Sequence, residues 1–104
     1  MISTAVSNVI TTADKYPYIT KIGIFGSRAR DDYTESSDLD ILIDYDSSSD
    51  IFLDNLEDFL DDVEYAFGGK IDIVTVPGLM DSKDDFFKSN VLREVKWLYN
   101  ATST

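Results

Sequence analysis

A chain of 104 residues that has neither cysteine nor histidine carries a net charge of −11, from 20 acidic and 9 basic side chains. This composition excludes disulfides and any thiolate or imidazole metal site. It also argues against direct nucleic-acid binding, because phosphate neutralisation needs a stripe of Lys and Arg. Metal or acid–base chemistry would have to use carboxylates, whose oxygen atoms favour Mg²⁺ or Mn²⁺ over Zn²⁺.

The length suits one domain over residues 1–104 and leaves little room for a separate substrate-binding lobe. If the chain is an enzyme, we therefore expect another molecule to present the substrate. No apolar run is long enough to span a bilayer, and no signal peptide is evident. We expect a cytoplasmic protein that does not enter a membrane.

The first third of the chain predicts a helix, a strand and a tight turn. Apolar side chains at helical spacing indicate a helix over residues 2–15, and a short apolar run indicates a strand over residues 19–25. Gly26-Ser27 interrupts that strand. Residues 27–30 then suit one helical turn, and the polar residues 31–37 suit a loop.

The clearest strand covers residues 38–45, in which alternate side chains point to opposite faces. One face carries Leu39, Ile41 and Ile43. The other face carries Asp38, Asp40, Leu42 and Asp44. This strand therefore presents an apolar face and a face rich in carboxylates.

A strong apolar stripe indicates a helix over residues 51–67. Ser49 or Asp50 can cap its N-terminus, and Gly68-Gly69 ends it. We therefore expect a short serine-rich loop and then a long amphipathic helix.

A third strand is expected over residues 70–76. Ser82-x-x-Asp85 resembles the capping box of a last helix, which runs to about Tyr99. These elements predict one α/β or α+β domain with a three-stranded sheet flanked by helices.

Gly26-Ser27, between a strand and a helical turn, is the first candidate functional feature. Glycine allows a phosphate to approach the backbone, and free N–H groups at the start of a helix can bind it. The Ser27 hydroxyl adds a donor. A plain strand-ending turn has the same sequence, so this pair alone is weak support.

Asp38 and Asp40 are the second feature, because residues two apart on a strand aim at the same spot. Two such carboxylates repel each other unless a cation lies between them, which points to a divalent metal. The alternative is a solvated strand face, as we expect for the similar pair Asp44 and Asp46.

Asp72 is the third feature, a carboxylate between Ile71 and Ile73 in an otherwise apolar strand. If this strand lies beside the Asp38 strand, all three carboxylates cluster. The alternative is that Asp72 is exposed, or pairs with Lys70 or an arginine.

Ten residues separate Ser27 from Asp38, which gives the pattern Gly-Ser-x10-Asp-x-Asp with a further carboxylate on a later strand. This pattern resembles the signature of the DNA-polymerase-β-like nucleotidyltransferase superfamily. Segments 26–30 and 37–43, and the ending 92–99, look most like the minimal nucleotidyltransferases, the MNT-type antitoxins. The resemblance implies the nucleotidyltransferase fold, with a mixed sheet.

The resemblance also implies roles for residues of this chain. Gly26 and Ser27 would bind the phosphates of ATP, and Asp38 and Asp40 would bind two Mg²⁺ ions. Asp72 would join one ion and help to deprotonate the attacking hydroxyl.

Three further positions bear on this site. Arg28 and Arg30 would contact the phosphates, although a surface ion pair suits each of them equally well. Asp31 stands where the family usually has glycine, which alters the loop that holds the nucleotide.

MNT-type antitoxins also lack a substrate domain, and their partner is a helical HEPN-type toxin, a ribonuclease. The resemblance therefore implies that this chain transfers AMP from ATP to a tyrosine of such a toxin and silences it. Two alternatives stay open. One is an antitoxin that acts only by binding and occlusion, and the other is a small-molecule nucleotidyltransferase.

Overall fold

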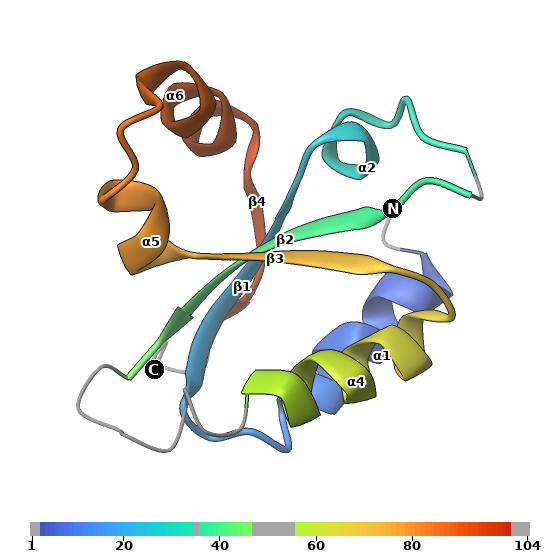
Figure 1. Cartoon of the computed structure of the whole chain (residues 1–104). Helices are drawn as coiled ribbons and strands as arrows, with labels where there is room; N and C mark the ends of the chain where they lie inside the picture. Colours follow the sequence, from blue (N-terminus) through green and yellow to red (C-terminus); the bar gives the residue numbers. More distant parts are fainter. Residues whose placement is uncertain (1–2, 35, 47–55, 101–104) are drawn as a thin grey trace.

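The structure is a computed structural model, and it describes residues 3–34, 36–46 and 56–100 (Figure 1). The elements in chain order are α1 (Thr4–Ala13), β1 (Ile19–Phe25), α2 (Ser27–Arg30), β2 (Leu39–Tyr45), α4 (Leu56–Phe67), β3 (Ile71–Thr75), α5 (Val76–Met80), α6 (Asp85–Glu94) and β4 (Lys96–Asn100). None of the described helices is both long and apolar enough to cross a membrane.

The strands form one mixed sheet in the order β3-β2-β1-β4. β1 is antiparallel to both β2 and β4, whereas β2 and β3 run parallel. The predicted α+β class with a mixed sheet flanked by helices is confirmed, but the sheet has four strands and not three.

The fourth strand lies where the sequence analysis expected the end of the last helix. α6 ends at Glu94, and Val95 takes an extended backbone with φ −61° and ψ 133°. Trp97 then pairs with Gly23 of β1, and Tyr99 pairs with Ile22. The expected helix to Tyr99 is therefore wrong, because aromatic side chains favour strands and the free edge of β1 supplies hydrogen bonds.

Helices cover both faces of the sheet. α1 and α4 pack together on one face, and α5 and α6 lie on the other (Figure 1). The first face buries Ile22, Leu39, Ile41, Ile43, Ile71, Val9, Phe59 and Val63, among others. The second buries Phe25, Leu42, Leu79 and Val91. The face that carries Asp40 is thus partly buried by α5 and α6. Asp40 and Asp72 lie on this face near the starts of β2 and β3.

The link between β3 and α6 forms a short helix that the sequence analysis did not predict. Thr75 caps α5, because its Oγ1 accepts a hydrogen bond from Gly78 N at 3.1 Å, and Pro77 suits the first turn. β3 consequently ends at Thr75 and not at Val76.

The cap of α6 is Asp84 and not Ser82, so the expected capping box is wrong. Asp84 Oδ1 accepts from Phe87 N at 3.0 Å. Ser82 Oγ accepts from Asp84 N at 3.1 Å and so shapes the turn before the helix. Asp is as good an N-cap as Ser, so local geometry decides between them.

The helices expected over residues 2–15 and 51–67 are confirmed over their described parts, as α1 and α4. α1 begins one residue after Ser3, whose Oγ accepts from Val6 N at 3.2 Å. α4 carries the expected apolar stripe, and Gly68 follows it with φ +83°. Residues 47–55, with the expected caps Ser49 and Asp50, lie outside the described residues, as do residues 1–2.

Candidate active site

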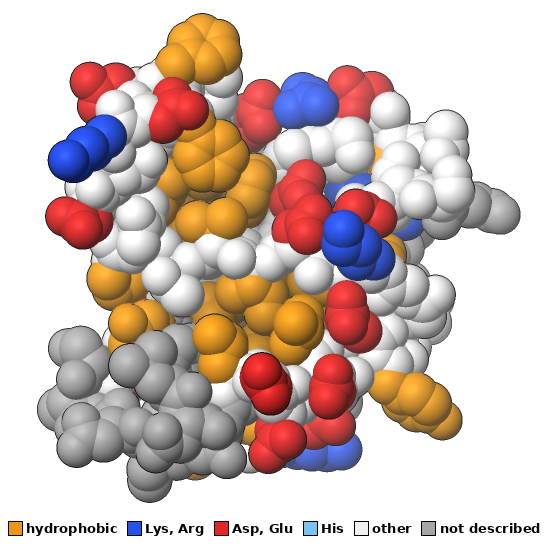
Figure 2. All heavy atoms as spheres, in the orientation of Figure 1, with side chains coloured by type: hydrophobic (Ala, Val, Ile, Leu, Met, Phe, Trp, Pro, Cys, Tyr) orange, Lys and Arg blue, Asp and Glu red, His pale blue; other side chains and the backbone are white. Residues whose placement is uncertain are grey.

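The parallel register of β2 and β3 places Asp40 directly beside Asp72. Paired residues share a face, so both carboxylates lie on the side of the sheet that carries α5 and α6. Figure 2 shows acidic side chains gathered near the start of these strands, beside an apolar area. Asp40 is half-buried, whereas Asp72 is exposed.

The environment of Asp40 opposes its negative charge. Burial raises the pKa of this carboxyl above its ordinary value, and the charges of Asp72 and Asp38 and a hydrogen bond with Asp72 raise it further. Arg30 acts in the opposite direction. A cation at this point would therefore be stabilised by carboxylates that repel one another in its absence.

Asp38 lies just before β2 and faces solvent more than Asp40 does. Its Oδ2 is 3.9 Å from Lys70 Nζ, which is a loose and exposed ion pair. Leu39 N donates to Lys70 O at 3.1 Å and so joins the starts of β2 and β3. Over the described residues, no three carboxylates are already arranged as ligands of a single ion.

Gly26 forms the turn that faces Asp40. Its backbone has φ +74° and ψ −154°, a region that is almost confined to glycine. A Cβ at this position would lie 2.4 Å from Asp40 Oδ2, so only glycine lets the turn approach the carboxylate so closely. Ser27 follows as the first residue of α2. The structure therefore brings the Gly26-Ser27 turn and Asp40 together.

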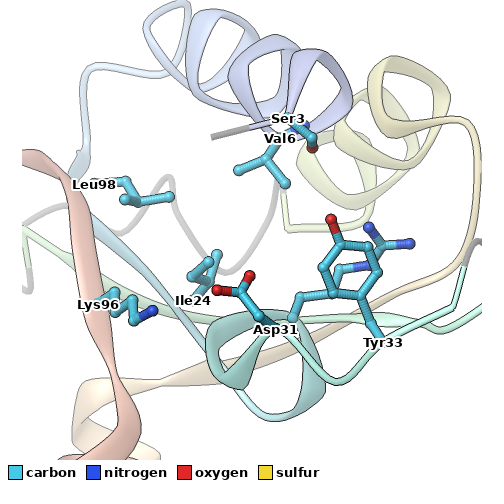
Figure 3. A pocket seen from close by; sticks show the side chains of 8 residues that line it. Ser3, Val6, Ile24, Asp31, Tyr33, Lys96 and Leu98 are labelled. Carbon is cyan, nitrogen blue, oxygen red and sulfur yellow. The ribbon is translucent and has the colours of Figure 1, made fainter. Parts of the chain in front are cut away.

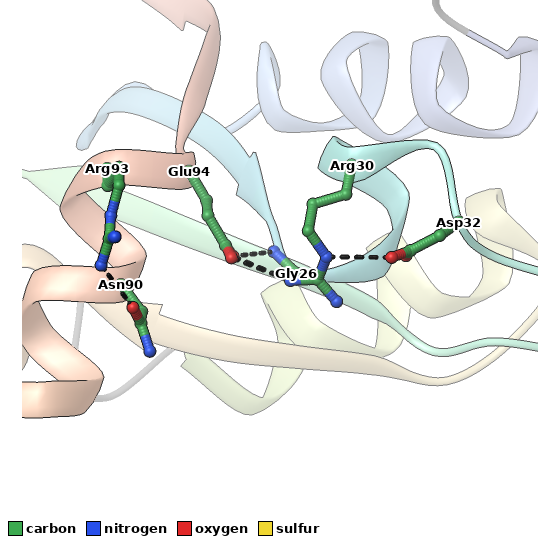
Figure 4. Close-up of polar contacts among 6 residues, drawn as sticks. All are labelled: Gly26, Arg30, Asp32, Asn90, Arg93 and Glu94. Atoms are coloured by element: carbon green, nitrogen blue, oxygen red, sulfur yellow. Dashed lines mark hydrogen bonds and ion pairs between the residues drawn. The ribbon is translucent and has the colours of Figure 1, made fainter.

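Arg30 and Glu94 form an ion pair at the same turn (Figure 4). Arg30 Nη1 donates to both carboxylate oxygens of Glu94, at 2.9 and 3.0 Å, and Nε donates to Asp32 at 3.1 Å. The hydrogen bonds with Asp32 and Glu94 raise the pKa of Arg30. Gly26 N donates to Glu94 Oε2 at 3.3 Å.

Glu94 is the residue of this site that the sequence analysis missed. The expected helix ran through it to Tyr99, which left its side chain without an assigned place. No local pattern links position 94 to a turn 68 residues earlier, although the segment 92–99 did resemble the family.

Arg28, which was expected to contact phosphates, packs against two aromatic rings and lines a cavity of about 500 Å³ together with Asp38 and Lys70. Its guanidinium carbon is 4.4 Å from the ring centroid of Tyr33 and 4.7 Å from that of Phe67. Its Nη2 donates to Ser37 O at 3.1 Å. These contacts hold the loop before β2 against α4 and leave Arg28 on the side of the sheet covered by α1 and α4.

A cavity of about 250 Å³ lies on that side (Figure 3). Its lining consists of Ser3, Val6, Ile24, Arg28, Asp31, Tyr33, Lys96 and Leu98. It shares no lining residue with the carboxylate cluster on the opposite face, so we do not assign it to the site.

Asp31 has φ +62°, in the left-handed region that glycine adopts without strain. We expect Asp31→Gly to raise the free energy of unfolding by about 0.5–1 kcal/mol, since it removes this strain. Urea denaturation measures the change. Asp31→Ala is the control, because it keeps the Cβ and should give no gain. Equal effects of the two changes would count against strain at this position.

The raised pKa of Asp40 has a consequence for stability in metal-free buffer. The folded protein holds the Asp40 proton to a higher pH than the unfolded chain does. The protonated carboxyl therefore contributes its full stability below the unfolded pKa of about 4. This contribution is lost as the pH rises through the pKa of the folded protein. Asp40→Asn cannot ionise. We expect it to exceed the wild type in stability at pH 7 by up to about 1 kcal/mol, after allowance for solvent screening.

Urea denaturation in EDTA between pH 3 and pH 7 tests this expectation. The difference between Asp40→Asn and the wild type should shrink as the pH falls. Asp61→Asn, on the exposed face of α4, controls for the loss of one charge. If both variants followed the same pH profile, burial and crowding of Asp40 would not be the cause.

Comparison with known proteins adds to this geometry. Residues 8–98 match the family described as "Nucleotidyltransferase domain". The chain is 41% identical over 83 residues to the "Putative protein adenylyltransferase MJ0604" of Methanocaldococcus jannaschii, a match that covers 78% of this chain and 79% of the relative. It is 44% identical over 63 residues to "Putative protein adenylyltransferase MJ1217" of the same organism, where the match spans only 60% of each chain.

Two solved structures share the fold. The crystal structure of a toxin–antitoxin with AMP-PNP superposes with a TM-score of 0.66 at 20% identity and covers 92% of this chain and 73% of its own. A structure described as a "putative minimal nucleotidyltransferase" gives a TM-score of 0.66 at 25% identity, with 88% and 87% covered.

Proposed function

Because the chain belongs to the nucleotidyltransferase domain family and resembles a structure described as a minimal nucleotidyltransferase, we propose that it transfers AMP from ATP to a tyrosine of a HEPN-type toxin and so neutralises it. One observation carries the proposal above all others. The register of β2 and β3 places Asp40 beside Asp72, and the Gly26 turn abuts the same carboxylate.

The donor set fits a divalent metal. Asp38, Asp40 and Asp72 supply oxygen ligands. Burial, and then the charges of Asp72 and Asp38, raise the pKa of Asp40, and a bound cation would offset this cost of its negative charge. The missing Cβ of Gly26 leaves space next to Asp40 Oδ2. We propose that these three residues hold two Mg²⁺ ions. When bound, such ions would lower the pKa of an acceptor hydroxyl and neutralise the departing pyrophosphate.

Phosphate binding and proton acceptance are assigned to residues of this chain. Gly26 N–H, Ser27 and Arg30 bind the phosphates of ATP. The acceptor oxygen attacks the α-phosphorus, the bond to pyrophosphate breaks, and the hydroxyl proton passes to Asp72, the more exposed member of the Asp40–Asp72 pair. Arg28 stays a proposed contact of the phosphates, because it lines a cavity together with Asp38.

The acceptor comes from a partner protein in this proposal. The chain is acidic, as suits a basic, ribonuclease-type partner, and α6 leaves Phe86 79% and Leu92 49% exposed. The structurally similar toxin–antitoxin was crystallised with AMP-PNP, which supports a toxin partner and ATP.

A second candidate function is neutralisation by binding alone. The observation in its favour is Asp31, which ends α2 with φ +62° where the family usually has glycine, next to the turn that would hold the nucleotide. In this alternative the toxin is occluded and no bond is formed.

The test is to mix the protein with the product of the adjacent gene, ATP and Mg²⁺, and to measure the intact mass of that neighbour. A gain of one or more AMP units supports transfer. The control replaces ATP by α,β-methylene-ATP, which cannot release pyrophosphate by this route. A stable complex without a mass change would reject transfer and support occlusion.

A further inference from the structure

The carboxylate of Glu94 holds two of the donors that we propose for ATP. Arg30 Nη1 contacts both of its oxygens, at 2.9 and 3.0 Å, and Gly26 N contacts Oε2 at 3.3 Å (Figure 4). The side chain of Glu94 is 25% exposed and reaches the turn from the last residue of α6.

A phosphate group cannot share these donors with Glu94. The Gly26 amide has a single hydrogen and Arg30 Nη1 has two, and the two oxygens of Glu94 accept from both groups. A phosphate that reached the same groups would also bring two negative charges into contact beside Asp40, in a site that has few cations. Binding of a phosphate at these donors therefore requires Glu94 to move.

The backbone at Glu94 is held in place, so the movement belongs to the side chain. Val95 N donates to Val91 O at 2.9 Å, and Lys96 pairs with Ile24 in the sheet. A Cβ on Gly23 would lie 2.5 Å from Val95 Cγ2, which shows how closely β1 packs against the residue after Glu94. A change of rotamer of Glu94 would free both Arg30 Nη1 and the Gly26 amide without moving the backbone.

We infer that Glu94 is a positioning residue that acts as an internal competitor of the nucleotide phosphates. Without nucleotide, its carboxylate orders Arg30 and the Gly26 turn. When ATP or another polyphosphate binds, Glu94 leaves and releases both donors. This inference rests on the proposed function, since it concerns the same turn.

The first test compares ATP affinity of the wild type with that of Glu94→Gln, by calorimetry in Mg²⁺ and in EDTA. Gln keeps the size and one acceptor but carries no charge, so we expect ATP to bind more tightly, by at most about fivefold, which is the upper limit for a partly exposed charge pair. Glu57→Gln is the matched control, on the exposed side of α4 on the opposite face of the sheet, and should bind ATP as the wild type does.

The second test needs no variant. Inorganic tripolyphosphate is titrated into isotope-labelled wild type while the NMR signals of the Glu94 side-chain carboxyl and the Gly26 amide are followed. Both signals should shift to new positions and saturate together. A purely structural Glu94 would keep its carboxyl signal unchanged at saturation.

The results separate the inference from the proposed function. If the wild type binds ATP but Glu94→Gln binds it equally or more weakly, or the Glu94 signal stays fixed, the competition is rejected and the nucleotide site stands. If the wild type binds neither ATP nor tripolyphosphate, the proposed function fails and the inference fails with it.

Discussion

Asp40→Asn is expected to lower AMP transfer on the order of 10³-fold or more, as the loss of a residue central to a catalytic unit does. The amide removes the charge of a proposed metal ligand at the point where Asp72 and the Gly26 turn converge on it. The fold should survive, because the charge of Asp40 is the unfavourable form in the folded protein. Single-turnover transfer of AMP to the partner measures the effect.

An Asp-to-Asn change at the C-terminal end of β2 is the control for the loss of one negative charge from this strand. Asp44→Asn removes one carboxylate from the same strand and keeps the Oδ1 that accepts from Tyr45 N at 2.9 Å. Its transfer rate should stay within about twofold of the wild type, as for substitutions away from the reacting groups. Equal transfer rates for Asp40→Asn and Asp44→Asn would show that Asp40 has no role in the transfer.

Gly26→Ala is expected to have the second-largest effect. The new Cβ would meet Asp40 Oδ2 at 2.4 Å in a backbone region that is almost confined to glycine. We expect the free energy of unfolding to fall by about 2–4 kcal/mol, from strain and displaced packing together. AMP transfer should be lost even where the protein is folded, because both Asp40 and the Gly26 N–H are displaced.

Gly68→Ala is the matched control for backbone strain. Gly68 has φ +83°, but a Cβ there meets nothing within 4 Å. It should cost only the conformational strain of about 1–2 kcal/mol and leave transfer intact. A similar loss of transfer in both glycine variants would show that strain, and not contact with Asp40, is responsible.

Much of the sheet could be predicted because its signals are local. The alternation in residues 38–45 predicts which side chains of β2 enter the core, and Leu39, Ile41 and Ile43 are buried as expected. Asp72 was placed only on condition that β3 neighbours β2. That pairing joins segments about 30 residues apart, so the chain alone could not decide it, and the structure meets the condition.

The end of the chain could not be predicted for a related reason. Leu92, Val95 and Tyr99 are spaced as on a helix, yet Lys96–Asn100 forms β4, because pairing with β1 outweighs local spacing. The contact of Glu94 with the Gly26 turn depends on where α6 ends, so it could not be predicted from the sequence either.

The positions of the two arginines near the turn also depended on tertiary contacts. Arg28 and Arg30 are two apart on α2 and had the same expectation. The guanidinium of Arg28 contacts Tyr33 and Phe67 on the α4 side. The guanidinium of Arg30 instead pairs with Glu94, near the carboxylates.

The central claim is that Gly26-Ser27 and the three carboxylates transfer a nucleotidyl group. The most direct measurement follows ATP labelled either in its α- or its γ-phosphate, with Mg²⁺ and the partner protein present. We expect the α-label to become covalently attached to the partner while the γ-label appears in pyrophosphate, and Asp40→Asn to abolish both. Attachment of the γ-label to the partner, or no release of pyrophosphate from a mixture in which both proteins are folded and bound, would contradict it.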